Sequence, residues 1–342
     1  DPHITAELAE TVNQWSRDTQ RPAMMIAETN VYDPQMAAKS DAGGMGFDAQ
    51  WCDDFLHSVF AVLRPGEQLS VRQYRSGSDL DQTLRMGFVY QGSVPRGEIE
   101  TAATIESRQR KPLSSRVDTH GMIYSIQNHD FIGNHPLGRR LHQLASPEAQ
   151  AAAAALLLLV PPIPMLFMGE EFLCAQPFQF FVDFTDPHLR EATAQGRMRE
   201  YPQHDWSGGR LPTDPEAFYD SKIGPANRGD QGTRAWYQAL IRLRKQWRSS
   251  GLLRDEHLTV ETDIPRGLYQ LQYAHAGQVA TVAVRLSALP VPDDELRCEI
   301  PGQLLLDSRD GQTDHSGLLA NHAKVFLQMA AEHAATSPTG RI

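Results

Sequence analysis

Short apolar segments alternate with helix-like segments along the first half of the chain, and this alternation restricts the fold more than any other feature. The strand candidates are residues 23–27, 47–51, 123–126 and 164–168. Between them, Leu8, Val12 and Trp15 have helical spacing, and Ser146-Pro147 is a typical start for a helix over residues 149–159. Apolar strands separated by helices are typical of a parallel sheet buried on both faces, in a barrel or a doubly wound sheet. We therefore expect an α/β fold.

The pattern changes near residue 250. A helix is predicted over residues 233–247, and from Gly251 alternating runs such as residues 268–273 are separated by Gly and Pro, as in a β-sandwich. We expect two domains, an α/β domain over residues 1–250 and an all-β domain over residues 251–342. The polar residues 64–117 carry little pattern, so we expect an excursion that faces the substrate.

Charge and cysteine usage exclude several classes of partner. The chain has 32 Lys and Arg against 42 Asp and Glu, a net charge of −10, which repels a phosphate backbone, so we expect no nucleic-acid partner. Prolines interrupt the longest apolar run, residues 149–167, so we expect no membrane span. Cys52, Cys174 and Cys298 lack metal-ligand spacing, which indicates no structural metal and reduced thiols in a cytoplasmic protein.

Polar side chains follow each predicted strand. In chain order they are Glu28, then Asp53, Asp54 and His57, then Asn128, His129 and Asp130, then Glu170 and Glu171. The carboxyl ends of parallel barrel strands face the ligand, so we expect one shared site. Paired carboxylates suit glycosyl transfer, where one acid protonates the departing oxygen and another carboxylate stabilises or attacks the oxocarbenium-like centre. Singly, each residue is also explained as a cap, a turn or a core side chain, and only their shared position favours a site.

Four of these segments resemble glycoside hydrolase family 13, the α-amylase family: Met25–Asn30, Gly46–Phe55, Ser125–Asp130 and Ile163–Phe172. Residues 48–51, 177–184 and 196–200 resemble the trehalose-releasing branch of the family more than its branching enzymes. The resemblance runs from residue 1 to about residue 248. It implies that the α/β domain is the second half of a TIM-type (β/α)8 barrel, strands five to eight, followed by a C-terminal β-sandwich.

The resemblance also implies roles for individual residues. Glu28 matches the general acid/base, and Asp130 matches the carboxylate that stabilises the transition state. Substrate contacts are implied at Trp51, Asp54, His57, Asn128 and His129. The implied reaction is hydrolysis of the α-1,4-glucosidic bond next to the trehalose end of maltooligosyl trehalose, which releases trehalose. Neither a metal nor an organic cofactor is implied.

The family nucleophile is an Asp in a segment that would precede residue 1. The resemblance therefore implies that barrel strands one to four, and the nucleophile with them, come from another part of the same protein or from another chain. The sequence also departs from the trehalose-releasing pattern at Leu56, Phe131 and His135, where that branch has His, Gln and Arg.

Two other hypotheses fit the same residues. A 1,4-α-glucan branching enzyme shares the core motifs, and the appearance of new α-1,6 branches on amylose would identify it. A non-catalytic subunit that binds glucan or a partner is favoured by the absence of an assignable nucleophile. An upstream sequence without an Asp at a strand end would support that second hypothesis.

Overall fold

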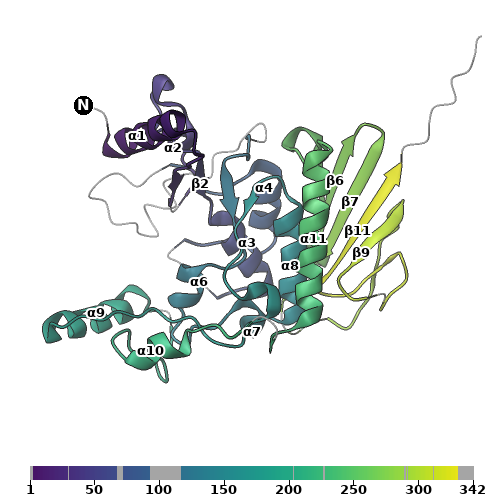
Figure 1. Cartoon of the computed structure of the whole chain (residues 1–342). Helices are drawn as coiled ribbons and strands as arrows, with labels where there is room; N and C mark the ends of the chain where they lie inside the picture. The colour runs from purple at the N-terminus through teal and green to yellow at the C-terminus, as the bar shows by residue number, and fades with distance from the viewer. Residues whose placement is uncertain are drawn as a thin grey trace, which may run out of the picture.

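The computed structural model describes residues 3–29, 31–67, 72–92, 117–202, 204–225, 228–288, 290, 292–310 and 312–329. Its α-helices are α1 (Ile4–Thr19), α2 (Pro34–Ala37), α3 (Asp54–Leu63), α4 (Ser78–Met86), α6 (His129–Gly133), α7 (Leu141–Leu144), α8 (Pro147–Leu159), α9 (Pro187–Glu200), α10 (Pro215–Asp220) and α11 (Gln231–Ser249). Its strands are β1 (Ile26–Ala27), β2 (Ala49–Trp51), β3 (Met122–Tyr124), β4 (Ile163–Pro164), β5 (Leu258–Asp263), β6 (Leu268–His275), β7 (Gln278–Arg285), β8 (Leu296–Arg297), β9 (Gln303–Asp307), β10 (Gly317–Leu318) and β11 (His322–Met329). Figure 1 shows α8 and α11 standing between the N-terminal sheet and the C-terminal sheet.

The first four strands form a parallel sheet in the order β1-β2-β3-β4, which confirms the predicted parallel sheet. All four strands are shorter than the apolar runs that predicted them. The prediction of a strand over residues 164–168 is wrong, because pairing with β3 ends at Pro164. Beyond it, the amide of Met165 still donates to the carbonyl of Tyr124 over 2.7 Å.

The C-terminal residues form antiparallel sheets, one of five strands in the order β5-β6-β7-β11-β9 and one that pairs β8 with β10. The predicted alternating runs lie in β6 and β7. A two-residue turn joins them, with positive φ at Ala276 (46°) and Gly277 (73°), as the twist of a tight hairpin requires. The predicted β-sandwich and the predicted boundary at residue 250 stay predictions.

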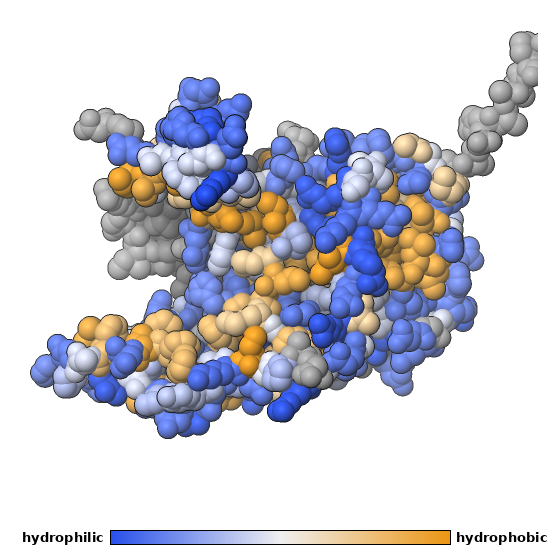
Figure 2. All heavy atoms as spheres, viewed as in Figure 1, coloured by the Kyte–Doolittle hydropathy of each residue, from blue (hydrophilic) through white to orange (hydrophobic). Residues whose placement is uncertain are grey.

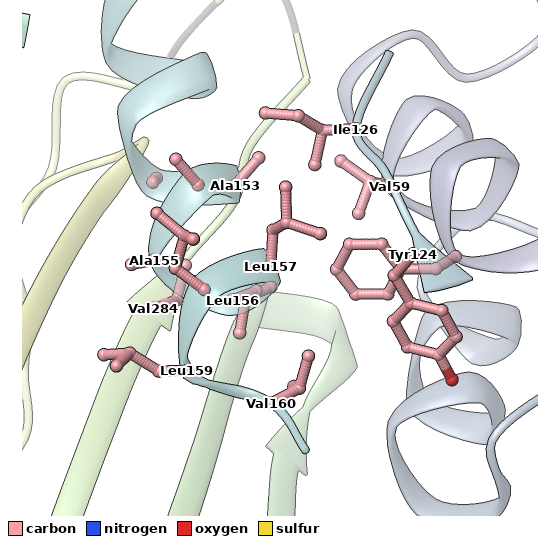
Figure 3. Packing of buried hydrophobic residues seen from close by; sticks show 14 of the residues in the cluster. Val59, Tyr124, Ile126, Ala153, Ala155, Leu156, Leu157, Leu159, Val160 and Val284 are labelled. Atoms are coloured by element: carbon pink, nitrogen blue, oxygen red, sulfur yellow. The ribbon is translucent and has the colours of Figure 1, made fainter. Parts of the chain in front are cut away.

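Helix α8 joins the two sheets into one core. The Ser146 side chain accepts from the Ala149 amide over 3.0 Å and Pro147 opens the first turn, as predicted. Alanines and leucines then surround the helix, and a helix that is apolar on all sides must be buried on all sides. Figure 3 shows Leu157 facing Val59 and Tyr124, with Val284 of β7 beyond the opposite side of the helix. The core is therefore continuous across residue 250.

The guanidinium of Arg244, on α11, caps the C-terminal end of α8. It donates to the carbonyls of Leu158 (2.9 Å), Val160 (2.6 Å), Pro161 (3.2 Å) and Pro162 (2.7 Å). The last carbonyls of a helix have no partner within the helix, and prolines cannot supply an amide to a neighbouring strand. Burial lowers the pKa of Arg244 to about 10, so the side chain keeps its charge at neutral pH. One buried cation therefore satisfies the turn that leads from α8 into β4.

The prediction of a patternless excursion over residues 64–117 is wrong in part. Helix α4 lies within it and buries Leu80 and Leu84 against α3. The helix was missed because its apolar positions are few and stand among acidic residues, of which Asp79 and Asp81 pair with nearby arginines. Residues 93–116 of this stretch lie outside the described residues. Over the part of the chain that is described, no helix has the length and apolar character that a membrane crossing needs.

Replacement of Arg244 by Met tests the cap. Arg244→Met leaves four buried carbonyls without their donor, so we expect the free energy of unfolding to fall by about 3 kcal/mol or more. Urea unfolding followed by circular dichroism measures the change. Arg242→Met is the matched control, because Arg242 is exposed on the same helix and should change stability by less than about 0.5 kcal/mol. Equal effects of the two substitutions would refute the cap.

Candidate active site

The ends of β1 and β3 bring three of the predicted residues together. Glu28 directly follows β1, and His129 and Asp130 open α6 just beyond β3. The His129 Nε2 lies 4.0 Å from Glu28 Oε1 and 3.5 Å from Asp130 Oδ1. All three side chains are exposed, by 60% for Glu28 and 57% for Asp130. The acid and the second carboxylate implied by the family resemblance thus face the same open space.

Asn128 fixes the position of His129 and Asp130. It is the N-cap of α6, with extended backbone at φ −147°, and its side-chain oxygen accepts from the Phe131 amide over 2.8 Å. Its Nδ2 donates to Asp53 Oδ1 over 3.4 Å. Asn128 is only 3% exposed, so both ends of its amide bind other parts of the chain. The structure therefore places this predicted substrate ligand beneath the site.

Trp51 lies at the same opening. It ends β2, and its ring meets the His129 ring edge-on, with 5.8 Å between centroids. The Thr29 hydroxyl donates to the Trp51 carbonyl over 3.3 Å, which ties the end of β1 to the end of β2. Trp51 is partly exposed and leaves part of its ring to solvent beside Glu28 and Asp130.

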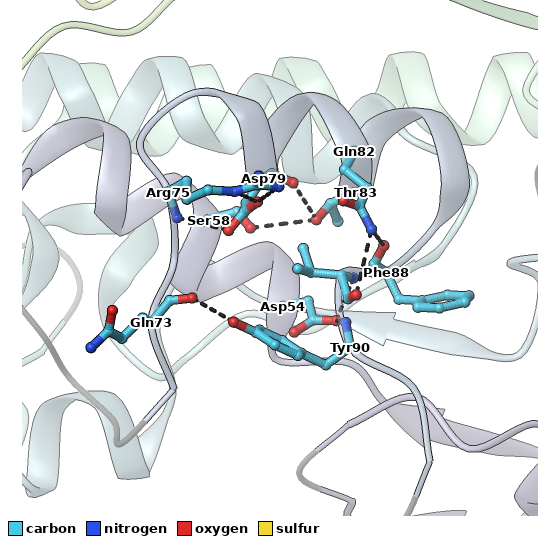
Figure 4. Close-up of polar contacts among 10 residues, drawn as sticks. Asp54, Ser58, Gln73, Arg75, Asp79, Gln82, Thr83, Phe88 and Tyr90 are labelled. Carbon is cyan, nitrogen blue, oxygen red and sulfur yellow. Dashed lines mark hydrogen bonds and ion pairs between the residues drawn. The ribbon is translucent and has the colours of Figure 1, made fainter. Parts of the chain in front are cut away.

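Asp54 lies apart from this group, in the buried first turn of α3. Its carboxylate accepts from the Tyr74 hydroxyl (2.7 Å) and from the amides of Val89 (2.6 Å) and Tyr90 (2.9 Å). Figure 4 shows Asp54 next to Tyr90. Burial raises the pKa of Asp54 even though these hydrogen bonds oppose the rise. The structure thus places this predicted substrate contact at the junction of α3 and residues 88–90.

His57 is also directed away from the group. Its ring stacks on Tyr74 with 4.9 Å between centroids and lines a small cavity of about 90 Å³ that Arg72 also lines. Burial, and then the charge of Arg72, lower the pKa of His57 to about 3, so the imidazole is neutral at neutral pH. The structure brings His57 together with Asp54 through Tyr74, and not with Glu28.

The sequence placed Asp53 among the strand-end acids, beside Asp54, but indicated no particular role for it in the site. Burial raises the pKa of Asp53 to about 7, with further rises from the charges of Asp130, Asp54 and Glu28 and a lowering by Arg72. The signal was its position directly after β2, where its side chain shares the strand-end edge with Glu28 and Asp130.

The prediction that Glu170 belongs to the shared strand-end site is wrong. Glu170 is completely buried, and its carboxylate accepts from the Phe167 amide (3.2 Å) and the Tyr237 hydroxyl (3.3 Å). Burial raises its pKa to about 8, so it is a neutral acid at neutral pH. Because β4 ends at Pro164, Glu170 does not stand at the end of that strand.

Glu28, His129 and Asp130 also form the single set of three potential metal ligands within the described residues, with ligand atoms at most 4.8 Å apart. Structural zinc sites close with four ligands and calcium sites with six or more. Three exposed groups are too few for either, so we assign no metal to them.

Comparison with known proteins identifies relatives along most of the chain, although no family model matches it. It is 32% identical over 297 residues to malto-oligosyltrehalose trehalohydrolase from Arthrobacter ramosus, which covers 85% of this chain and 49% of the relative. It is 35% identical over 251 residues to the protein of the same name from Rhizobium sp., which covers 71% of this chain and 41% of the relative. The chain thus spans about half the length of these relatives.

Solved structures give the same result for the fold. A putative α-amylase from Salmonella typhimurium superposes with a TM-score of 0.70 at 25% identity, over 96% of this chain and 54% of that one. Trehalose-6-phosphate hydrolase from Bacillus licheniformis superposes with a TM-score of 0.52 at 12% identity, over 94% of this chain and 59% of that one. The chain therefore belongs to the α-amylase family, glycoside hydrolase family 13, as a relative of the malto-oligosyltrehalose trehalohydrolases.

Proposed function

We propose that this chain supplies the part of the active site that contains the general acid, Glu28, in a glycosidase that releases trehalose from maltooligosyl trehalose. The observation that carries the proposal is the meeting of Glu28, His129 and Asp130 at the ends of β1 and β3. The names of the relatives support the choice of substrate. The three cysteines are free, which fits a cytoplasmic location.

In the proposed reaction, Glu28 donates its proton to the glucosidic oxygen as the bond from that oxygen to the sugar carbon breaks. The trehalose oxygen leaves as a hydroxyl, and positive charge develops on the sugar carbon. Asp130 faces this charge, and His129 binds a sugar hydroxyl beside it. Glu28, now ionised, takes a proton from the water that completes hydrolysis. Asn128 holds the start of α6, which carries His129 and Asp130, whereas Asp54 and His57 support the neighbouring contacts with Tyr74.

We further propose that other strands pair with the edges of the parallel sheet and close the barrel. Among the described residues, β1 and β4 each have one strand partner, and a barrel leaves no such edges. Large apolar side chains are exposed nearby, at Ile4, Leu8, Trp15, Met24 and Ile26. Figure 2 shows hydrophobic surface beside and below α1. The missing strands, and the carboxylate that completes a retaining pair, would come from another segment of the protein or another chain.

Replacement of Glu28 tests the assignment of the acid. We expect Glu28→Gln to lower kcat on maltotriosyl trehalose by roughly 10²–10⁴-fold, because Gln has no proton to donate. The assay follows trehalose release by the full-length protein, or by this chain reconstituted with its upstream half.

Glu171→Gln is the matched control, since Glu171 is also a predicted strand-end carboxylate but is absent from the close set of Glu28, His129 and Asp130. Activity retained in Glu28→Gln would contradict the assignment. New α-1,6 branches on amylose, without free trehalose, would identify a branching enzyme instead.

Trp51 is expected to bind a sugar ring. We expect Trp51→Ala to raise KM by roughly 2- to 10-fold with a smaller change in kcat, because the apolar face of glucose loses an aromatic surface. Steady-state kinetics on maltotriosyl trehalose measure this. Trp51→Phe keeps a ring face and should restore most of the affinity. A KM unchanged in Trp51→Ala would exclude Trp51 from the substrate site.

Leu8 tests the closure of the barrel. Leu8 is 50% exposed here, and we expect the closed protein to bury it. Leu8→Ser should therefore lower the stability of the full-length protein by about 2 kcal/mol and should make the isolated chain more soluble. Denaturant unfolding and the soluble yield of each form measure the two effects. A full-length protein that loses less than about 0.5 kcal/mol would show that Leu8 stays in water.

A further inference from the structure

We propose that Asp53 is a positioning residue of this active site, which holds Asn128 at the end of β3 and adds a third acid beside Glu28 and Asp130. The inference rests on the proposed function for its kinetic consequences. Its geometry does not depend on that function. Asp53 belongs to the residue pair at the end of β2, of which the family resemblance implies a role only for Asp54.

The contact with Asn128 gives Asp53 its positioning role. Asp53 occupies the N-cap position of α3, yet its backbone is already helical (φ −71°, ψ −10°) and its side chain makes no capping hydrogen bond. The carboxylate accepts instead from Asn128 Nδ2 over 3.4 Å. The other end of the same amide fixes the first turn of α6, which carries Asp130. Asp53 therefore acts on Asp130 through the side chain of Asn128, and this contact links the ends of β2 and β3.

The charges around Asp53 give it a second effect. Four charged groups face it: the carboxylates of Asp130, Asp54 and Glu28, and the guanidinium of Arg72. Burial and the three acids raise the pKa of Asp53 to about 7, and Arg72 opposes them. Below that pH the site carries one negative charge fewer beside Glu28 and Asp130. Ionisation of Asp53 near neutral pH therefore changes the field at the reacting sugar carbon.

Two substitutions separate the contact from the charge. Asp53→Asn keeps an oxygen that accepts from Asn128 and removes the ionisation, whereas Asp53→Ala removes both. In the full-length protein we expect Asp53→Ala to lower kcat roughly tenfold or more, because Asp130 loses its support. We expect the wild-type pH profile to have a step near pH 7, and we expect Asp53→Asn to keep most of kcat below pH 6 and to lose that step.

Thermal melting of each variant tests the charge without relying on catalysis. The folded-state pKa lies above the ordinary value of 3.8, so ionisation of Asp53 destabilises the fold. The penalty is absent below about pH 4, grows as the pH rises, and is complete above about pH 7. The melting temperature of Asp53→Asn should therefore exceed that of the wild type by a margin that grows over this range. Asp41→Asn, at an exposed carboxylate, should show no such trend.

The outcomes distinguish this proposal from the proposed function. A wild-type protein that releases no trehalose, but in which Asp53→Asn shows the growing melting margin, would overturn the function and keep the raised pKa of Asp53. Asp53→Ala with wild-type kcat would overturn the positioning role. A pH profile and a melting margin that both match those of Asp41→Asn would overturn the charge effect.

Discussion

The burial of α8 is the constraint on which the rest of the structure depends. The helix is alanine and leucine on every side, so it needs cover all round, and neither sheet alone provides it. Val59 and Tyr124 cover one side, and Val284 lies across the other. Arg244 then fixes where α8 ends. Its guanidinium donates hydrogen bonds to carbonyls, such as those of Val160 and Pro162, that would otherwise have no donor. The antiparallel sheet therefore packs against the same hydrophobic core as the parallel sheet.

The position of the active site follows from this packing. Helix α8 holds β3 and β4 in place, and β3 delivers Asn128 to the edge of the sheet where β1 delivers Glu28. Each of the strands β1 to β4 contributes only two or three residues to the parallel sheet. Hydrogen bonds beyond the strand ends therefore help to align the site residues that follow these strands. Thr29 with Trp51, and Asp53 with Asn128, each join neighbouring strand ends. The reacting groups are therefore oriented by side chains that do not react.

Parallel strands place their carboxyl ends at one edge, which made the meeting of Glu28, His129 and Asp130 predictable from spacing alone. The same rule failed for Glu170, because pairing with β3 ends at Pro164 and Glu170, six residues further on, is buried among the core partners Phe167 and Tyr237. The sequence placed Asp54 at the correct edge of the sheet, but it did not predict that Asp54 is buried. The amides that bind it belong to Val89 and Tyr90, and no periodicity marks that segment. Local patterns predicted the elements, whereas long-range partners decided which polar groups stay in water.

The proposed role of Glu28 as an acid depends on what covers the outer edge of β1, because Glu28 is exposed beside that edge. A general acid passes its proton to the departing oxygen, and water around the acid competes as an acceptor of that proton. Glu28 is 60% exposed, beside a strand whose outer edge has no partner among the described residues. Strands that pair with β1 would remove water from Glu28. Closure of the barrel would then supply the surroundings in which Glu28 can act as an acid, as well as the second carboxylate.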